Sequence, residues 1–138
     1  MAKAKVTIGR LEYIALPKLG VERVEAKLDT GAYRSALHYQ KIGLRTVDDH
    51  EELVVTFAMG RKRTKMAFKR FHKVTVKSST GHRTERYLVT TAVELNGHKV
   101  NTQFTLFDRS DMKYQVLLGR KFLSGRFVVD VARKNVLR

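Results

Sequence analysis

Cysteine and tryptophan are absent from this sequence, and proline occurs once in 138 residues. Without cysteine the chain cannot form a disulfide, a thiolate nucleophile, a cysteine-based zinc site or an iron–sulfur cluster. No segment approaches the roughly 20 consecutive apolar residues that cross a membrane as a helix, and the first ten residues lack the apolar run of a signal peptide. We therefore expect a protein that acts in the cytoplasm and not at a membrane.

Acidic residues are also scarce. Lysine and arginine number 28 against 13 aspartates and glutamates, which gives a formal net charge of +15. Such a charge attracts polyanions, and it does not by itself choose among nucleic acid, an anionic membrane and an acidic polypeptide. Hydrophobic residues make up 43% of the chain, enough for a buried core, and no linker or repeat divides it. We expect one domain over residues 1–138.

Apolar residues recur mostly with the period of two that is typical of β-strands. The expected strands cover residues 11–16, 24–28, 53–57, 65–77, 87–95, 100–106, 116–118 and 127–131. Asn96-Gly97 predicts a tight hairpin turn, because both residues tolerate a positive φ. Only residues 33–40 and 121–123 look helical. The pattern predicts an all-β barrel or sandwich of about six to eight strands with one or two short helices.

Leu28-Asp29-Thr30-Gly31-Ala32 is the motif with the clearest chemical meaning. An apolar strand delivers a carboxylate, a hydroxyl and a glycine into a tight turn, which suits one half of an aspartic protease active site. The absence of a side chain at Gly31 lets its backbone amide approach the Asp29 carboxylate and support its charge. The same triplet is also common in solvated β-turns, so on its own it leaves both interpretations open.

A second segment, Val116–Leu123, lies about ninety residues after the first. It consists of apolar residues, a glycine, an arginine and an amphipathic turn. The two segments together resemble the retropepsins, single-domain aspartic proteases in which the acidic loop lies beside a buried apolar-apolar-glycine strand followed by a short helix. The resemblance implies a retropepsin-like fold, which is a closed β-barrel.

Further motifs narrow the resemblance to a bacterial and archaeal family of retropepsin-like proteins known as "ATP-dependent zinc protease". The matching motifs follow the family's order from about Ile8 to about Arg133; they are Ile8–Arg10, Ala26–Ala32, Ser35–His38, Gly81–Arg83, Glu85–Tyr87, Asp111-Met112, Leu117–Arg120 and Gly125–Asp130. The sequence has no His-Glu-x-x-His motif and no P-loop, so its residues support neither zinc nor ATP. We expect no metal and no cofactor.

A retropepsin mechanism needs two carboxylates about 3 Å apart that share one proton. This chain contains a single Asp-Thr-Gly triplet. The catalytic residues Asp29, Thr30 and Gly31 of two chains would therefore have to meet on a two-fold axis. We expect a homodimer, and we expect the monomer to be inactive.

Residues close to the motifs are the candidates for substrate binding. Ala32 is small enough to line a substrate groove, and Arg34 is placed to pair with an acidic substrate side chain. Arg83 and Arg86 belong to a hairpin segment that is a candidate flap. Arg120 has two interpretations, a substrate contact and a salt bridge that braces the dimer.

Two hairpin turns are candidates for the flap that closes over a retropepsin site, Met59-Gly60-Arg61 and Thr80-Gly81-His82, and the sequence does not choose between them. The first opens a run of eight cations without an acid over residues 61–77. This run is interpreted as a solvated strand face, as a surface that steers an acidic substrate, or as a nucleic-acid contact.

Members of the resembled family often accompany RimK-type ATP-grasp ligases, which add glutamates to protein or peptide ends. The resemblance thus implies an aspartic peptidase, acting as an endopeptidase or an exopeptidase, on glutamate-rich peptides or polyglutamate tails. It also implies a functional association with such a ligase. A charge of +15 suits a polyanionic peptide. Two alternatives remain: a basic β-barrel that binds nucleic acid, and a catalytically inactive retropepsin fold that serves as a binding module.

Overall fold

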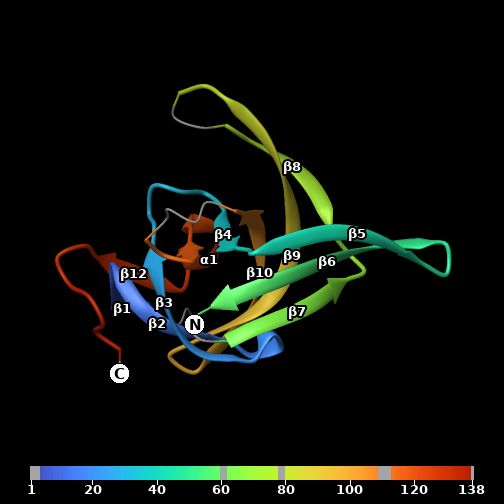
Figure 1. The fold of residues 1–138 in the computed structure, drawn as a ribbon. Coiled ribbons are helices and arrows are strands. Elements are labelled where there is room, and N and C mark those ends of the chain that lie inside the picture. Colours follow the sequence, from blue (N-terminus) through green and yellow to red (C-terminus); the bar gives the residue numbers. More distant parts are fainter. Residues whose placement is uncertain (1–3, 60–61, 78–79, 109–112, 138) are drawn as a thin grey trace.

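The fold is a computed structural model that describes residues 4–59, 62–77, 80–108 and 113–137, and it is built almost entirely from strands (Figure 1). Within these residues there are twelve strands, one α-helix and one 3-10 helix. Their bounds are β1 Val6–Gly9, β2 Leu11–Leu16, η1 Pro17–Leu19, β3 Val21–Leu28, β4 Ser35–His38, β5 Lys41–Val47, β6 His50–Met59, β7 Lys62–Phe68, β8 His72–Lys77, β9 Arg83–Leu95, β10 His98–Phe107, β11 Val116–Leu118, α1 Arg120–Leu123 and β12 Phe127–Asp130.

Six strands close into a barrel. Their order is β10-β4-β11-β3-β2-β9, and β9 closes the ring by pairing with β10. The predicted Asn96-Gly97 turn is confirmed, with φ of 52° and 78° at the two residues, and it sets the antiparallel register in which Leu95 lies opposite His98. Closure removes free strand edges within the ring, which is how an all-β chain of this size protects its backbone groups. The expected retropepsin-like closed barrel is confirmed.

A three-stranded antiparallel sheet, β5-β6-β7, lies beside the barrel (Figure 1). Its central strand alternates with period two: Leu53, Val55 and Phe57 are buried, whereas Val54 and Thr56 are only half-buried. The buried face belongs to the same apolar cluster as barrel residues such as Phe104. One face of the sheet therefore covers the core, and the opposite face is left to solvent.

The chain ends are joined outside the barrel. Strand β1 pairs in parallel with β12, so that Gly9 lies opposite Asp130. The fully buried Glu12 carboxylate accepts hydrogen bonds from three backbone N–H groups, those of Gly9 at 2.7 Å, Val136 at 3.0 Å and Leu137 at 3.1 Å. A single side chain of β2 thus fixes both the first strand and the C-terminal segment. In the part of the chain that the structure describes, no helix has the length and apolar character needed to span a membrane.

Three expectations about secondary structure need correction. Residues 33–40 were expected to be helical, but they contain strand β4, which pairs with β10 and β11 and is buried over Ser35–Leu37. A short apolar segment does not reveal its conformation by periodicity, and pairing with neighbours decides it. Residues 65–77 form two strands, β7 and β8, instead of one. The described residues hold twelve strands where six to eight were expected, and the strands left out of the prediction include the short β1 and the largely exposed β5. The expected helical turn at residues 121–123 is confirmed within α1.

Candidate active site

Asp29 stands directly after β3, where this strand runs between β2 and β11. The backbone on both sides of the turn is fixed: Leu28 donates its N–H to Arg10 O at 2.9 Å, and Asp29 donates its N–H to Leu118 O at 2.8 Å. The Asp29 side chain is half-buried, and Thr30 and Gly31 are exposed. A buried, doubly paired strand therefore presents a carboxylate at the barrel surface with little freedom in the backbone that carries it.

The turn that follows is closed by hydrogen bonds of its own. Gly31 donates its N–H to Asp29 Oδ1 at 3.0 Å, and Ala32 donates its N–H to Asp29 O at 3.2 Å. A Cβ added at Gly31 would lie 3.3 Å from Asp29 Oδ1, closer than most real Cβ contacts. The approach of the Gly31 amide to the carboxylate is the geometry expected from the sequence.

The Asp29 loop, residues 29–34, rests against the segment that contains Gly119. Arg120 donates its N–H to Ala32 O at 2.8 Å, and Lys121 donates its N–H to Tyr33 O at 3.0 Å. Gly119 is required here, because an added Cβ would lie 2.6 Å from Arg34 O. Two segments about ninety residues apart thus pack closely through backbone contacts. This close packing explains why the segment that faces the Asp29 loop carries a glycine at position 119.

Two arginines frame an exposed tyrosine beside the loop. Arg120 donates from Nη1 to Thr30 O at 3.1 Å, and its Cζ lies 6.0 Å from the centre of the Tyr33 ring. Arg34 Cζ lies 5.9 Å from the same ring, and its buried Nη1 has no hydrogen-bond partner among the described residues. Tyr33 itself is 55% exposed. The loop therefore presents a carboxylate, an aromatic face and two guanidinium groups within a few residues.

Arg83 and Arg86 lie on β9, in the β8–β9 hairpin that extends beyond the barrel on the side of the Asp29 loop (Figure 1). Arg83 is exposed and Arg86 is half-buried. Among the described residues, no hydrogen bond or ion pair joins either arginine to the Asp29 loop. Both flap candidates lie in antiparallel hairpins. The turn Met59-Gly60-Arg61 joins β6 to β7, and its Gly60 and Arg61 lie outside the described residues. The turn Thr80-Gly81-His82 lies between β8 and β9.

Tyr39 is the one described group whose pKa is clearly displaced. Burial raises the pKa of the Tyr39 phenol above its usual 10.0, the Asp108 carboxylate raises it further, and the Arg86 guanidinium opposes both. Arg86 therefore acts electrostatically near Tyr39. No group of three or more histidine, aspartate or glutamate side chains in the described part of the chain is arranged to hold a metal ion.

Sequence analysis assigned no role to two residues of this region, Tyr33 and Ser35, although Ser35 begins the family-like segment Ser35–His38. The Ser35 hydroxyl accepts a hydrogen bond from Gly119 N–H at 3.1 Å, which ties the two motif segments together. An aromatic residue directly after the acidic turn and Ala32 could have marked Tyr33 as a site residue. The local sequence around Ser35 did not reveal its role, because its partner Gly119 lies 84 residues away. Asp111 and Met112, which belong to a family-like motif, lie outside the described residues.

Fold and site together define a retropepsin-like protein. A solved structure of protein Lpg0085 from Legionella pneumophila, with unknown function (DUF785), superposes with a TM-score of 0.78 over 96% of this chain and 98% of that one, at 23% identity. The family model described as "Retropepsin-like aspartic endopeptidase RimB" matches residues 7–138. The chain belongs to this RimB-like family.

Curated relatives carry a different name. A protein of Shewanella halifaxensis named "Probable alpha-L-glutamate ligase" is 32% identical over 94% of this chain and 29% of its own length. A protein of Desulfotalea psychrophila with the same name is 30% identical over 97% of this chain and 30% of its own length. The chain thus spans about three tenths of the length of the curated relatives it matches.

Proposed function

We propose that the chain is an aspartic peptidase that hydrolyses glutamate-rich peptides or polyglutamate tails, with Asp29 as its catalytic residue. The observation that carries this proposal is the Asp29 loop, in which the Gly31 amide supports the Asp29 carboxylate at 3.0 Å on a rigid strand end. Membership of a family described as retropepsin-like aspartic endopeptidases supports the reaction class and favours cleavage within a chain.

The mechanism requires a second Asp29. In the dyad, the ionised carboxylate takes a proton from water, whose oxygen adds to the carbonyl carbon of the scissile bond, while the protonated carboxyl group gives its proton to the carbonyl oxygen. The C–N bond of this tetrahedral intermediate then breaks. The nitrogen takes up the proton held by the first carboxyl group, and the second carboxylate recovers its proton from a hydroxyl of the intermediate. One loop per chain supplies one carboxylate, so we propose that Asp29, Thr30 and Gly31 meet their counterparts of a second copy across a two-fold axis.

The substrate assignment rests on the cations around the loop and on the relatives. Within the described residues, the buried Nη1 of Arg34 has no hydrogen-bond partner, and a glutamate carboxylate is the acceptor that a guanidinium group favours. Ala32, Arg83, Arg86 and Arg120 are proposed as further substrate contacts. The relatives named as glutamate ligases contain a similar region within longer chains. A hydrolase that removes glutamates is the chemical counterpart of a ligase that adds them, and we propose a functional association of this kind.

The direct test is mass spectrometry of an α-linked oligoglutamate incubated with purified protein. Asp29→Asn should lower turnover by about 10³-fold, because it removes the acid–base group and keeps an oxygen for the Gly31 amide. Asp49→Asn makes the same chemical change in the exposed turn between β5 and β6 and should leave turnover unchanged. Undiminished activity of Asp29→Asn would exclude this mechanism.

Dilution supplies a second, independent readout. Specific activity should fall as the protein is diluted through its dimerisation range, because each monomer holds half of the dyad. A monomer that stays fully active at every dilution would contradict the shared site. Dimers that never cleave oligoglutamate, whether or not Asp29 is changed, would favour the inactive binding module. In that case, salt-sensitive binding of nucleic acid is the next experiment.

A further inference from the structure

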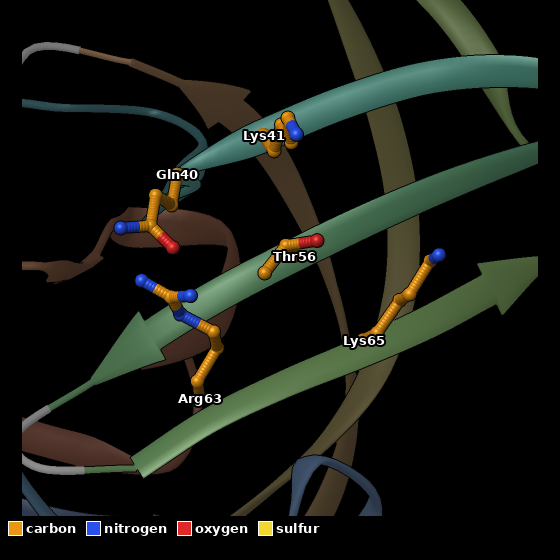
Figure 2. A pocket seen from close by; sticks show the side chains of 5 residues that line it. All are labelled: Gln40, Lys41, Thr56, Arg63 and Lys65. Carbon is orange, nitrogen blue, oxygen red and sulfur yellow. The ribbon is translucent and has the colours of Figure 1, made fainter.

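The outer face of the β5-β6-β7 sheet holds a basic groove made of two adjoining cavities. One cavity of about 630 Å³ is lined by Gln40, Lys41, Thr56, Arg63 and Lys65 (Figure 2). The second, of about 340 Å³, shares three of these residues and extends the groove past Gly43 and Val54 to Arg45. None of these residues belongs to the Asp29 loop. The groove therefore offers a separate surface for a ligand.

Strand register brings the cations of the groove together. Lys41 lies opposite Thr56 on β6, and Thr56 lies opposite Lys65 on β7, so the three side chains form one row across the sheet. Arg63 precedes Lys65 by two positions and shares its face. Figure 2 shows the Arg63 guanidinium directed toward Gln40 and the Lys65 amine extended over the outer face. The opposite face of β6 is the buried one, so these side chains are fixed on the solvent side.

Within the described residues, most cations of the groove have no acidic partner. The acid on this face, Glu52, is already paired with Arg45, whose Nη2 lies 3.0 Å from Glu52 Oε1. Within the described parts of the chain, no carboxylate forms an ion pair with Lys41, Arg63 or Lys65. Arg63 and Lys65 lie on one face of β7, and Lys41 lies two strands away across Thr56, so their like charges repel one another at moderate distance. A cluster of cations that repel one another and have no acidic partner among the described residues points to an anionic ligand.

The lining favours an acidic polypeptide over a nucleic acid. Proteins that bind single-stranded nucleic acid combine cations with aromatic residues that stack on the bases, and none of the described residues that line either cavity is aromatic. In an extended polyglutamate chain, carboxylates on one side recur about every 6.6 Å, which is the spacing of Arg63 and Lys65 along their strand. Gly43, which has no side chain, leaves room for a backbone beside the cations.

We propose that this basic groove is an exosite for glutamate-rich chains, which holds the part of a polyglutamate substrate that lies outside the active site. This inference rests on the proposed function and assigns it a second binding surface. The exosite would bind long substrates more tightly than short ones, because only a long chain reaches both the groove and the Asp29 loop.

Binding is tested first, in Asp29→Asn protein so that the ligand survives. The probe is a fluorescent α-linked oligoglutamate of about 20 residues, whose extended length of roughly 65 Å exceeds the width of this fold. K41Q/K65Q should weaken binding about tenfold and reduce its salt dependence. K99Q/K134Q removes the same charge from exposed positions outside the groove and should change binding less than about twofold.

Turnover is tested next, in protein with an intact Asp29. K41Q/K65Q should raise KM for the long oligoglutamate about tenfold and leave cleavage of an oligoglutamate of about four residues unchanged. Equal losses for long and short substrates, or equal effects of the groove and control pairs, would overturn the exosite. Tighter binding of single-stranded RNA, with the same loss in K41Q/K65Q, would overturn it in favour of a nucleic-acid site. Failure of every variant to cleave, with groove-dependent binding retained, would reject the proposed peptidase and leave the binding surface standing.

Discussion

The Asp29 loop and the basic groove are built by different means. The loop is held by backbone hydrogen bonds between segments far apart in sequence, such as Arg120 N–H to Ala32 O, and its critical positions are glycines. The groove is a row of long side chains on one face of a local antiparallel sheet. A site made from backbone tolerates almost no added volume. A site made from side chains tolerates volume changes and depends on charge.

Two buried glutamates give the largest expected contrast between the barrel and the outer sheet. Glu12→Ala should lower the free energy of unfolding by about 3–5 kcal/mol, because three backbone N–H groups lose their acceptor inside the protein. Glu52→Ala should cost about 1 kcal/mol, since its partner Arg45 is half-exposed to water. Urea unfolding of both variants measures the difference. Equal losses would mean that the C-terminal segment is not held through Glu12.

Replacement of two glycines by alanine gives the next largest expected contrast, between the Asp29 loop and the basic groove. Gly119→Ala should cost about 2–3 kcal/mol and abolish turnover, because the new Cβ meets backbone atoms of the Asp29 loop. Gly43→Ala, on the floor of the groove, should be neutral or stabilise by about 0.5 kcal/mol, since nothing lies within 4 Å of the added Cβ and the strand loses less entropy. Thermal unfolding and oligoglutamate cleavage measure both. An active, stable Gly119→Ala protein would contradict the interlocked loop.

The smallest effect is expected at Tyr39, where the chain passes from the barrel to the outer sheet. Its N–H bonds to Phe107 O, and the next residue, Gln40, bonds to Thr56 O on β6. The pKa of the Tyr39 phenol is raised in the folded protein above the unfolded value of 10.0. The neutral phenol therefore contributes fully to the free energy of unfolding below pH 10.0, and this contribution is lost as pH rises through the higher folded pKa. Tyr39→Phe should therefore flatten the decline of stability above about pH 10. If urea unfolding shows the same loss of stability at alkaline pH in Tyr39→Phe as in the unchanged protein, another group causes that loss.

Local chemistry in the sequence was enough to predict several features. Asn96-Gly97 specified its hairpin because few residues accept positive φ at both positions. The β-branched and aromatic residues of Leu53–Phe57 predicted a strand, and the structure contains it within β6. Asp29, Thr30 and Gly31 specified a turn in which an amide meets a carboxylate, and the structure contains that contact. Their catalytic roles stay predictions.

Other features depend on partners that no local pattern reveals. Ser35–His38 is a strand because β10 and β11 lie on either side of it, although the segment by itself looked helical. Ser35 and Tyr33 gain their positions from Gly119 and Arg120 across the chain. The basic groove also needs the register of three strands to gather Lys41, Arg63 and Lys65 on one face.

The sequence by itself determined the charge of +15, the β-rich character of the chain and the acidic turn, because each depends on residue type and short-range spacing. Only the tertiary structure decided which segments flank Asp29, how Glu12 fixes the C-terminal segment and where the unpaired cations gather. These features arise from barrel closure and strand register, which are set by contacts between residues far apart in the chain.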